Sequence, residues 1–312
     1  MWLPGGQAEK VTETADFRPG EDYFGGLERP FGGQGVVLAI GPLRMGLEGL
    51  DADQAREIGS RFHAFVDAAC TWPDVRIALR DAGVGAFLGM PRPGTYEVYR
   101  LESRTLGSRL ALWSYEFAGF IDSADGRGAL ALVERAGPLF ERGLENFLRV
   151  VTASWMLRRG GFLLHACGVV RDGMAYIFFG PSGAGKTTVT QLSPNDTILS
   201  DDLTLVVPGP TGYMAAGIPF GLAHHRVPDT TGSFPIAAMH RLVQSRSVRR
   251  DPIRGARAVG EVATSLPFVM QETSQAALAL DTVEKALATI PVYRLEFRKD
   301  DAFWGVVAPG RN

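Results

Sequence analysis

The sequence predicts an α/β fold of mixed (α+β) character, in which a phosphate-loop domain follows a small α+β N-terminal module. Two observations carry this prediction. Short apolar runs typical of strands are interleaved with windows whose apolar residues recur at helical spacing. A glycine-rich loop at residues 180–187 also stands between one such strand and a helix-compatible stretch. The chain of 312 residues is long enough for two domains.

We expect three parts along the chain. Residues 1–34 are rich in Gly, Pro and charge and predict an irregular arm. Residues 35–155 predict a small α+β module, a candidate for recognising an acceptor. Residues 156–312 predict the phosphate-loop domain, because short apolar strands follow "RRGG" at 158–161.

The front module is expected to contain strands and two helices. Asp51 and Gln54 predict a capping box at the start of the first helix. The apolar positions on its face are Ala55, Ile58, Phe62, Phe65 and Ala69. A strand and a turn are expected in "VVLAIGPLRMGL", and strands, separated by turn residues, in "TYEVYRLE" and "SRLALWSYEFAGFID". The second helical face is formed by Phe140, Leu144, Phe147, Val151 and Trp155, near the expected boundary.

The back part is expected to follow the loop with strands, two helices and a last strand. Its strands are "FLLHACGVV", "MAYIFF", "TILS", "LTLVV" and, near the end, "VYRLEF". Its helical windows are "RGARAVGEVATSLPF" and "TSQAALALDTVEKALATI".

Composition narrows the class of protein. The net charge of -2 gives no electrostatic reason to expect nucleic acid or an anionic membrane as partner. Cys70 and Cys167 are too few for a disulfide framework or a cysteine metal cluster, which fits a reducing compartment. No basic stretch precedes an apolar run, and no apolar window of about 18 residues occurs. We therefore expect a soluble, cytoplasmic protein.

The phosphate loop is the most specific motif. Gly180, Gly185, Lys186 and Thr187 match G-x-x-x-x-G-K-[ST]. In such loops the main-chain N–H groups converge on phosphate oxygens, the lysine contacts the terminal phosphates and the hydroxyl binds Mg²⁺. The predicted nucleotide-binding residues are Gly180, Pro181, Ser182, Gly183, Ala184, Gly185, Lys186, Thr187 and Thr188.

Two aspartates follow the loop. "TILSDD" places Asp201 and Asp202 after a short strand, about fifteen residues beyond the loop, where phosphate-loop proteins carry a magnesium ligand. One carboxylate can hold the metal while the other takes a proton from an attacking hydroxyl. The alternative is that the second aspartate is a solvated turn residue or helix cap.

The order of these residues resembles a known family. "HACGVVRDGMAYIFFGPSGAGKTT", followed by "LSDDLTLV", resembles the catalytic domain of HPr kinase/phosphorylase and its HprK-like relatives, a fold shared with phosphoenolpyruvate carboxykinases. His165 stands fifteen residues before Gly180, which is the family's spacing. The resemblance is specific over residues 160–207 and weaker through "AAGIPFGL" and the C-terminal part.

The resemblance implies roles for these residues. Lys186 would assist transfer, Thr187 and Asp201 would bind Mg²⁺, and Asp202 is favoured over Asp201 as the general base. His165 would lie beside the reacting centre, where a near-neutral pKa lets it orient the acceptor or an aspartate. The alternative for a lone histidine in a strand is a structural role. The implied cofactors are ATP and Mg²⁺, and related catalytic domains form homo-oligomers.

One departure from the family bears on the acceptor. The bifunctional enzymes carry an acidic metal ligand after the aspartates, whereas "GYMAAGIPFGL" contains no acidic residue. HprK-like relatives act on other acceptors, including ribosomally made peptides, and the chain resembles that looser group.

Arginines gather later in the chain. The stretch from His240 to Gly260 holds Arg241, Arg246, Arg249, Arg250, Arg254 and Arg257. Arg249 and Arg250, with Arg226 in "LAHHRV", are candidate contacts for phosphate or acceptor, because the guanidinium fork binds such groups bidentately. The alternative is a solvated basic face.

Three functions are compatible with these residues. The first is a Mg-ATP-dependent kinase that transfers the γ-phosphate to a hydroxyl, with a serine of a protein or peptide as the expected acceptor. The second is a nucleotide-binding switch or assembly module with little transferase activity. The third is a kinase with a small-molecule acceptor.

Overall fold

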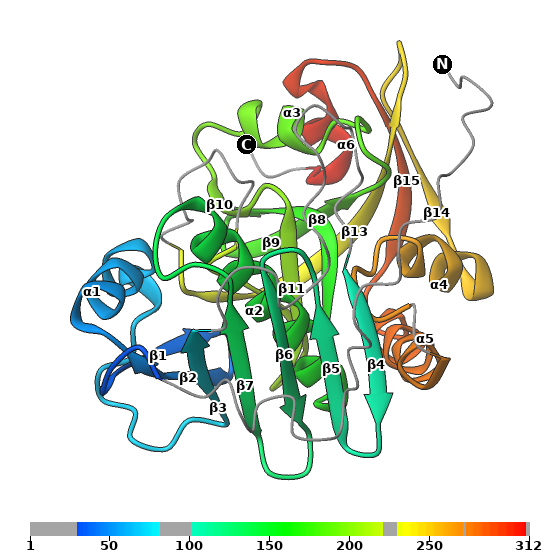
Figure 1. Ribbon diagram of the computed structural model, residues 1–312. Coiled ribbons are helices and arrows are strands. Elements are labelled where there is room, and N and C mark those ends of the chain that lie inside the picture. The colour runs from blue at the N-terminus through cyan, green and yellow to red at the C-terminus, as the bar shows by residue number, and fades with distance from the viewer. Residues whose placement is uncertain (1–29, 82–100, 221–229, 271–272, 310–312) are drawn as a thin grey trace, which may run out of the picture.

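The computed structural model has a mixed α+β fold built on two mixed β-sheets (Figure 1). It describes residues 30–81, 101–220, 230–270 and 273–309. The fold class expected from the sequence is thereby confirmed at the level of mixed α and β structure. None of the helices in the described part of the chain combines the length and apolar composition needed to cross a bilayer.

The first sheet has seven strands in the order β1-β2-β3-β7-β6-β5-β4. β2 and β3 are parallel, as are β3 and β7, and the other neighbours are antiparallel. Its strands are β1 (Gln34–Ile40), β2 (Leu43–Leu50), β3 (Val75–Asp81), β4 (Glu102–Leu106), β5 (Arg109–Trp113), β6 (Phe117–Asp122) and β7 (Arg127–Leu132).

Helix α1 (Ala52–Arg61) begins as the sequence predicts. The Asp51 side chain accepts hydrogen bonds from the Asp53 and Gln54 N–H groups, and the Gln54 side chain accepts one from the Asp51 N–H. The helix is shorter than its apolar spacing indicates, because a 3-10 turn at His63–Phe65 follows it. Phe62 and Phe65 are buried all the same, since 3-10 spacing also returns a side chain to one face every three residues.

The second sheet has eight strands. Its main order is β10-β8-β11-β12-β13-β15-β14, and β9 pairs with both β8 and β13. The strands are β8 (Phe162–Arg171), β9 (Met174–Phe179), β10 (Thr197–Ser200), β11 (Leu203–Gly209), β12 (Gly212–Ala216), β13 (Ser233–Gln244), β14 (Arg249–Ile253) and β15 (Val292–Phe297). β13 runs parallel to β9 and β15, and the remaining pairs are antiparallel.

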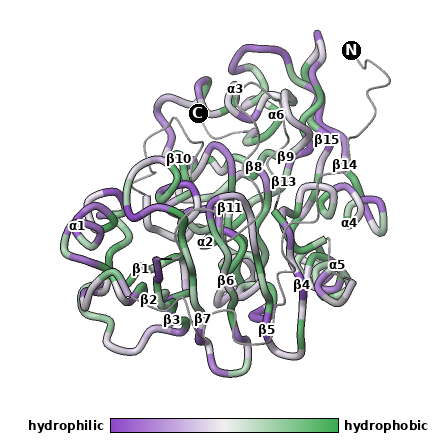
Figure 2. Tube along the Cα trace, in the orientation of Figure 1, coloured by the Kyte–Doolittle hydropathy of each residue, from purple (hydrophilic) through white to green (hydrophobic). Residues whose placement is uncertain are grey.

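Helices cover both faces of the second sheet. One core cluster joins its strands to residues of α2 (Pro138–Arg158), α4 (Gly255–Ala263) and α5 (Thr273–Leu287). A second cluster joins it to α3 (Lys186–Gln191) and α6 (Trp304–Val307). In Figure 2 the connection between β13 and β14 is hydrophilic, in keeping with its polar sequence "QSRSVRR".

Helix α2 lies between the two sheets. It contacts β6 and β7 of the first sheet and β8 of the second (Figure 1). Most of its residues are buried on all sides, as expected for a helix inside a protein. The boundary predicted near residue 155 therefore falls in a helix that packs on both halves, and the division into domains stays a prediction.

Candidate active site

The phosphate-loop sequence connects β9 to α3, so the strand before it and the helix after it are both present. Gly185 has φ 113°, a conformation that L side chains rarely adopt. A Cβ there would lie 2.5 Å from the Phe297 ring, so this position also has no room for a larger residue. The main chain of the loop can therefore come close to a bound group, with no side chain at Gly185 in the way.

Lys186 is held inside the loop. It is buried, and its Nζ donates to the main-chain oxygens of Gly180 at 3.0 Å and Pro181 at 3.5 Å. Burial lowers the pKa of Lys186, and the charge of Asp202 opposes that shift. The buried Cys167 thiol, whose pKa is raised to about 12 by burial, stays neutral beside it.

The two aspartates interrupt what is otherwise one strand running antiparallel along β8. Ser200 at the end of β10 pairs with Gly168, and Leu203 at the start of β11 pairs with His165. Asp201 and Asp202 stand between these pairs. The Ser200 hydroxyl accepts hydrogen bonds from the Asp202 and Leu203 N–H groups, which fixes the turn of the chain there.

This register brings His165 and Asp202 together. Nε2 of His165 lies 3.1 Å from Oδ1 of Asp202, with the imidazole 43% exposed and the carboxylate side chain 15% exposed. Burial alone would raise the pKa of Asp202. The hydrogen bond and charge of His165, with the charges of Arg149 and Lys186, outweigh burial and leave this pKa below its usual value. Asp202 is therefore ionised at neutral pH.

Two further contacts hold the loop and the histidine strand. Gln244, at the end of β13, donates from Nε2 to the Gly183 oxygen at 2.6 Å. The His165 N–H donates to the Ser265 oxygen at 2.8 Å, just beyond the end of α4. Sequence reasoning missed both residues, because each acts through contacts between segments far apart in the chain.

The hydroxyl groups of the loop are candidate ligands for a metal ion. Thr187 is exposed on the first turn of α3, Thr188 is half-buried and Ser182 is exposed. No group of three or more His, Cys, Asp or Glu able to hold a metal lies within the described ranges. A hydroxyl and one carboxylate suit Mg²⁺ all the same, since this ion usually keeps several waters and binds phosphate oxygens. Thr187 and Asp201 are the residues that could hold it.

The predicted arginine contacts are placed differently from one another. Arg226 lies outside the described residues. Arg249 forms an ion pair with Asp251 at 2.6 Å. Arg250 donates to the Val307 oxygen at 2.8 Å and lies over the Tyr293 ring at 4.0 Å. The contacts found for Arg250 are thus structural ones, between β14, β15 and α6.

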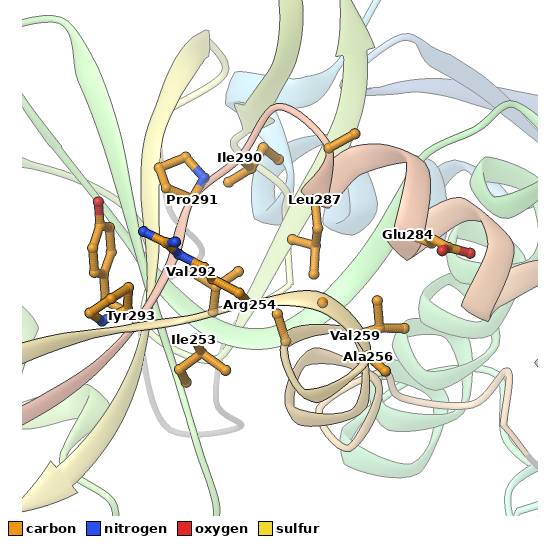
Figure 3. A pocket seen from close by; sticks show the side chains of 14 residues that line it. Ile253, Arg254, Ala256, Val259, Glu284, Leu287, Ile290, Pro291, Val292 and Tyr293 are labelled. Carbon is orange, nitrogen blue, oxygen red and sulfur yellow. The ribbon is translucent and has the colours of Figure 1, made fainter.

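A separate pocket opens between α4, α5 and the strands β14 and β15 (Figure 3). Its volume is about 510 Å³, and Ile253, Leu287 and Val292 give it an apolar lining, with Arg254 and Glu284 among the residues around it. None of the described residues that line it is a predicted site residue. The pocket is therefore distinct from the loop and the His165–Asp202 pair.

Comparison with known proteins gave a matching family model and likenesses to solved structures. A solved structure, the Hpr(Ser) kinase/phosphatase from Coxiella burnetii, is similar over 44% of this chain and 85% of its own, with 12% identity and a TM-score of 0.25. No curated protein matches the sequence. The family model described as "SynChlorMet cassette protein ScmC" matches residues 145–309, just over half of the chain. The chain belongs to the ScmC family.

Proposed function

We propose that this protein is a Mg-ATP-dependent kinase of the HprK-like group that transfers the γ-phosphate to a hydroxyl, with a serine of a protein or peptide as acceptor. One observation carries the proposal. His165, whose Nε2 lies 3.1 Å from Oδ1 of Asp202, is on β8, and β8 pairs with β9, the strand leading into the loop. A phosphate loop beside an oriented, ionised carboxylate is suited to hydroxyl activation.

Each residue has a role in the proposed reaction. The loop from Gly180 to Thr187 binds the phosphates, and Lys186 balances their negative charge. Thr187 and Asp201 would hold Mg²⁺, and the chemistry that this ion would supply is positive charge against the phosphates. Asp202 accepts the proton of the acceptor hydroxyl as its oxygen bonds to the γ-phosphorus. The bond from that phosphorus to the β–γ bridging oxygen breaks at the same time, and ADP leaves.

The low pKa of Asp202 is compatible with this role. A weak base suffices because phosphoryl transfer passes through a loose transition state, in which the hydroxyl proton is lost late. Orientation of the hydroxyl then matters more than proton affinity. His165 favours the ionised form of Asp202 and orients it, and its ring is partly exposed and so open to an acceptor.

A cytoplasmic location and a homo-oligomeric assembly belong to the same proposal, as does selection of the acceptor by residues 35–155. The alternatives are a nucleotide-binding switch or assembly module with little transferase activity, and a kinase for a small hydroxyl compound. The absence of an acidic residue from "GYMAAGIPFGL" favours an acceptor other than that of the bifunctional enzymes.

The test is transfer of label from γ-labelled ATP with Mg²⁺. Serine-containing peptides, a cell lysate and a set of small hydroxyl compounds are offered separately. We expect label on a peptide or protein, in an alkali-labile and acid-stable linkage typical of phosphoserine. Label only on a small compound would favour the small-molecule kinase. Nucleotide binding without label on any acceptor would favour the alternative of a nucleotide-binding switch or assembly module.

A further inference from the structure

The pocket between α4, α5, β14 and β15 has no part in the candidate active site (Figure 3). Its volume of about 510 Å³ falls within the range of about 300 to 1,000 Å³ that is typical of ligand sites. Its most buried lining residues, Ile253, Ile290 and Val292, are all apolar. Ordinary packing leaves only small voids, so a space of this size and lining is a candidate binding site.

The two helices line the pocket with apolar side chains. On α4, Ala256 and Val259 are three residues apart, which places them on one face of the helix. On α5, Leu287 lines the pocket, and Leu280 stands seven residues before it on the same helical face. Leu280 is 40% exposed. The apolar surface therefore continues from the pocket along α5, and we call the pocket together with Leu280 the α4–α5 groove.

Two charged side chains of the groove have no protein partner. Arg254, just before α4, and Glu284, on α5, are both exposed. Within the described part of the chain neither side chain forms an ion pair or a hydrogen bond, whereas Arg249 and Lys285 nearby are both in ion pairs. In Figure 3 Arg254 and Glu284 lie at opposite sides of the pocket, with Leu287 between them. An occupant would therefore meet a cation at one end, an anion at the other and apolar surface between.

The end of the groove at Arg254 is suited to a carboxylate. Helix α4 begins there, no side chain caps its first N–H groups, and its first turn holds no acidic residue. The positive end of the helix dipole adds to the charge of the guanidinium at this end. A Cβ placed on Gly255 would meet nothing within 4 Å, so there is room for a bound group beside the start of the helix.

We propose that the α4–α5 groove binds an extended peptide segment in which a short apolar run separates an acidic residue from a basic one. The acidic side chain pairs with Arg254, the apolar side chains pack between Val259 and Leu287, and the basic side chain pairs with Glu284. Sites for small molecules bring their few polar groups together on one ligand. Here the two charges stand apart across an apolar lining, and the apolar surface continues along α5, which favours a chain-like ligand.

The groove is well separated from the phosphate loop. Val292 of the pocket lining and Phe297, whose ring lies against Gly185, are five residues apart on β15. At 3.3 Å per residue this is about 17 Å. A serine that reaches the loop must therefore stand at least about five extended residues away from the bound segment. That the segment belongs to the phosphate acceptor rests on the proposed kinase function, in which the groove would hold the acceptor peptide while its serine reacts.

Binding is tested on the full chain without nucleotide, by fluorescence anisotropy. The probes are labelled peptides with a glutamate, a short run of leucine and valine, and a lysine, in both orders along the chain. Arg254→Glu should weaken binding of the best probe about tenfold, and a probe with lysine in place of its glutamate should recover it. Glu284→Lys should behave in the same way toward the other end of the probe. The matched control is Arg257→Glu, an equal change of charge at an exposed position of α4 outside the pocket lining.

Recovery by the charge-reversed probes, with no loss in the control, supports the proposal. If no probe binds, or if Arg254→Glu and Arg257→Glu weaken binding equally, the proposal is overturned. Self-association of the chain that Arg254→Glu abolishes would also overturn it, in favour of a second copy of the chain as the occupant. The substituted side chains are exposed, so the variants should keep the urea transition of the wild type.

The binding measurement needs no phosphoryl transfer, so its result stands apart from the proposed function. Binding without labelled product on any acceptor would reject the kinase and keep the peptide site. In an active enzyme, Arg254→Glu should raise KM without lowering kcat for a peptide that carries both the segment and a serine more than about five residues away. An unchanged KM for that peptide would overturn the docking role.

Discussion

The imidazole of His165 and the carboxylate of Asp202 lie within 3.1 Å of each other, although 36 residues separate them in the chain. The contact follows from the antiparallel pairing of β8 with β11, which sets Leu203 opposite His165. The contact sets a hydrogen-bond donor, the His165 ring, against one of the two aspartates. It therefore distinguishes Asp202 from Asp201.

His165→Ala should raise the pKa of Asp202, because the carboxylate loses a hydrogen bond and a charge that favour its ionised form. A positioned base contributes about 100-fold to 10,000-fold in rate. Loss of its orienting partner should cost less, about 10-fold to 100-fold in kcat. His165→Gln, whose amide can still donate, should recover part of the rate. Equal losses in both variants would argue against an orienting hydrogen bond.

Gln244→Ala should weaken nucleotide binding by loosening the phosphate loop. The lost bond, from Gln244 to the Gly183 oxygen, is exposed, so we expect about 1 kcal/mol or less, equivalent to about fivefold in Kd. Calorimetric titration with ATP and Mg²⁺ measures this. Gln191→Ala, at an exposed position on α3, is the control and should bind as the wild type does. An unchanged Kd for Gln244→Ala would mean that the contact does not shape the bound loop.

His240 predicts an acid-dependent loss of stability. It is fully buried and stacked on Phe178 at 5.1 Å, and within the described chain neither ring nitrogen has a hydrogen-bond partner. Burial, and next the charge of Arg250, lower its pKa to about 3. The Ile177 main chain opposes this shift without reaching hydrogen-bond geometry. The ring therefore stays neutral in the folded protein at any mildly acidic pH.

The unfolded chain binds a proton at His240 below about pH 6.5, whereas the folded protein does not until about pH 3. This histidine alone thus lowers the free energy of unfolding by about 1.4 kcal/mol per pH unit as pH falls through that window. His240→Phe should remove this slope and add about 1 to 2 kcal/mol at neutral pH. Urea unfolding at several pH values checks both. The exposed His63→Gln should keep the slope, and a His240→Phe protein as acid-sensitive as the wild type would contradict the prediction.

Local sequence patterns were enough to predict those parts of the fold and site whose residues are contiguous in the chain. The apolar strand, glycine loop and helix at 174–191 appear as expected, as does the long helix ending near residue 158. The capping box at Asp51 is present for the same reason, since its bonds join residues three apart. These features depend on neighbours in sequence, which periodicity and spacing can show.

Other parts depend on pairings that the sequence does not display. β13 was not predicted, because His240 and Arg241 interrupt its apolar pattern, yet it lies between β9 and β15 and is buried there. "SRLALWSYEFAGFID" is two strands with a turn at residues 114–116, whereas we expected one. "TYEVYRLE" lies largely outside the described residues.

The most direct test of the central claim compares binding and transfer in Asp202→Asn and Lys186→Ala. If Asp202 is the base of a kinase, Asp202→Asn should bind ATP and Mg²⁺ nearly as the wild type does and lose about 100-fold or more of the transfer rate. Lys186→Ala should abolish transfer as well. Asp202→Asn protein that transfers labelled phosphate at the wild-type rate would contradict the account.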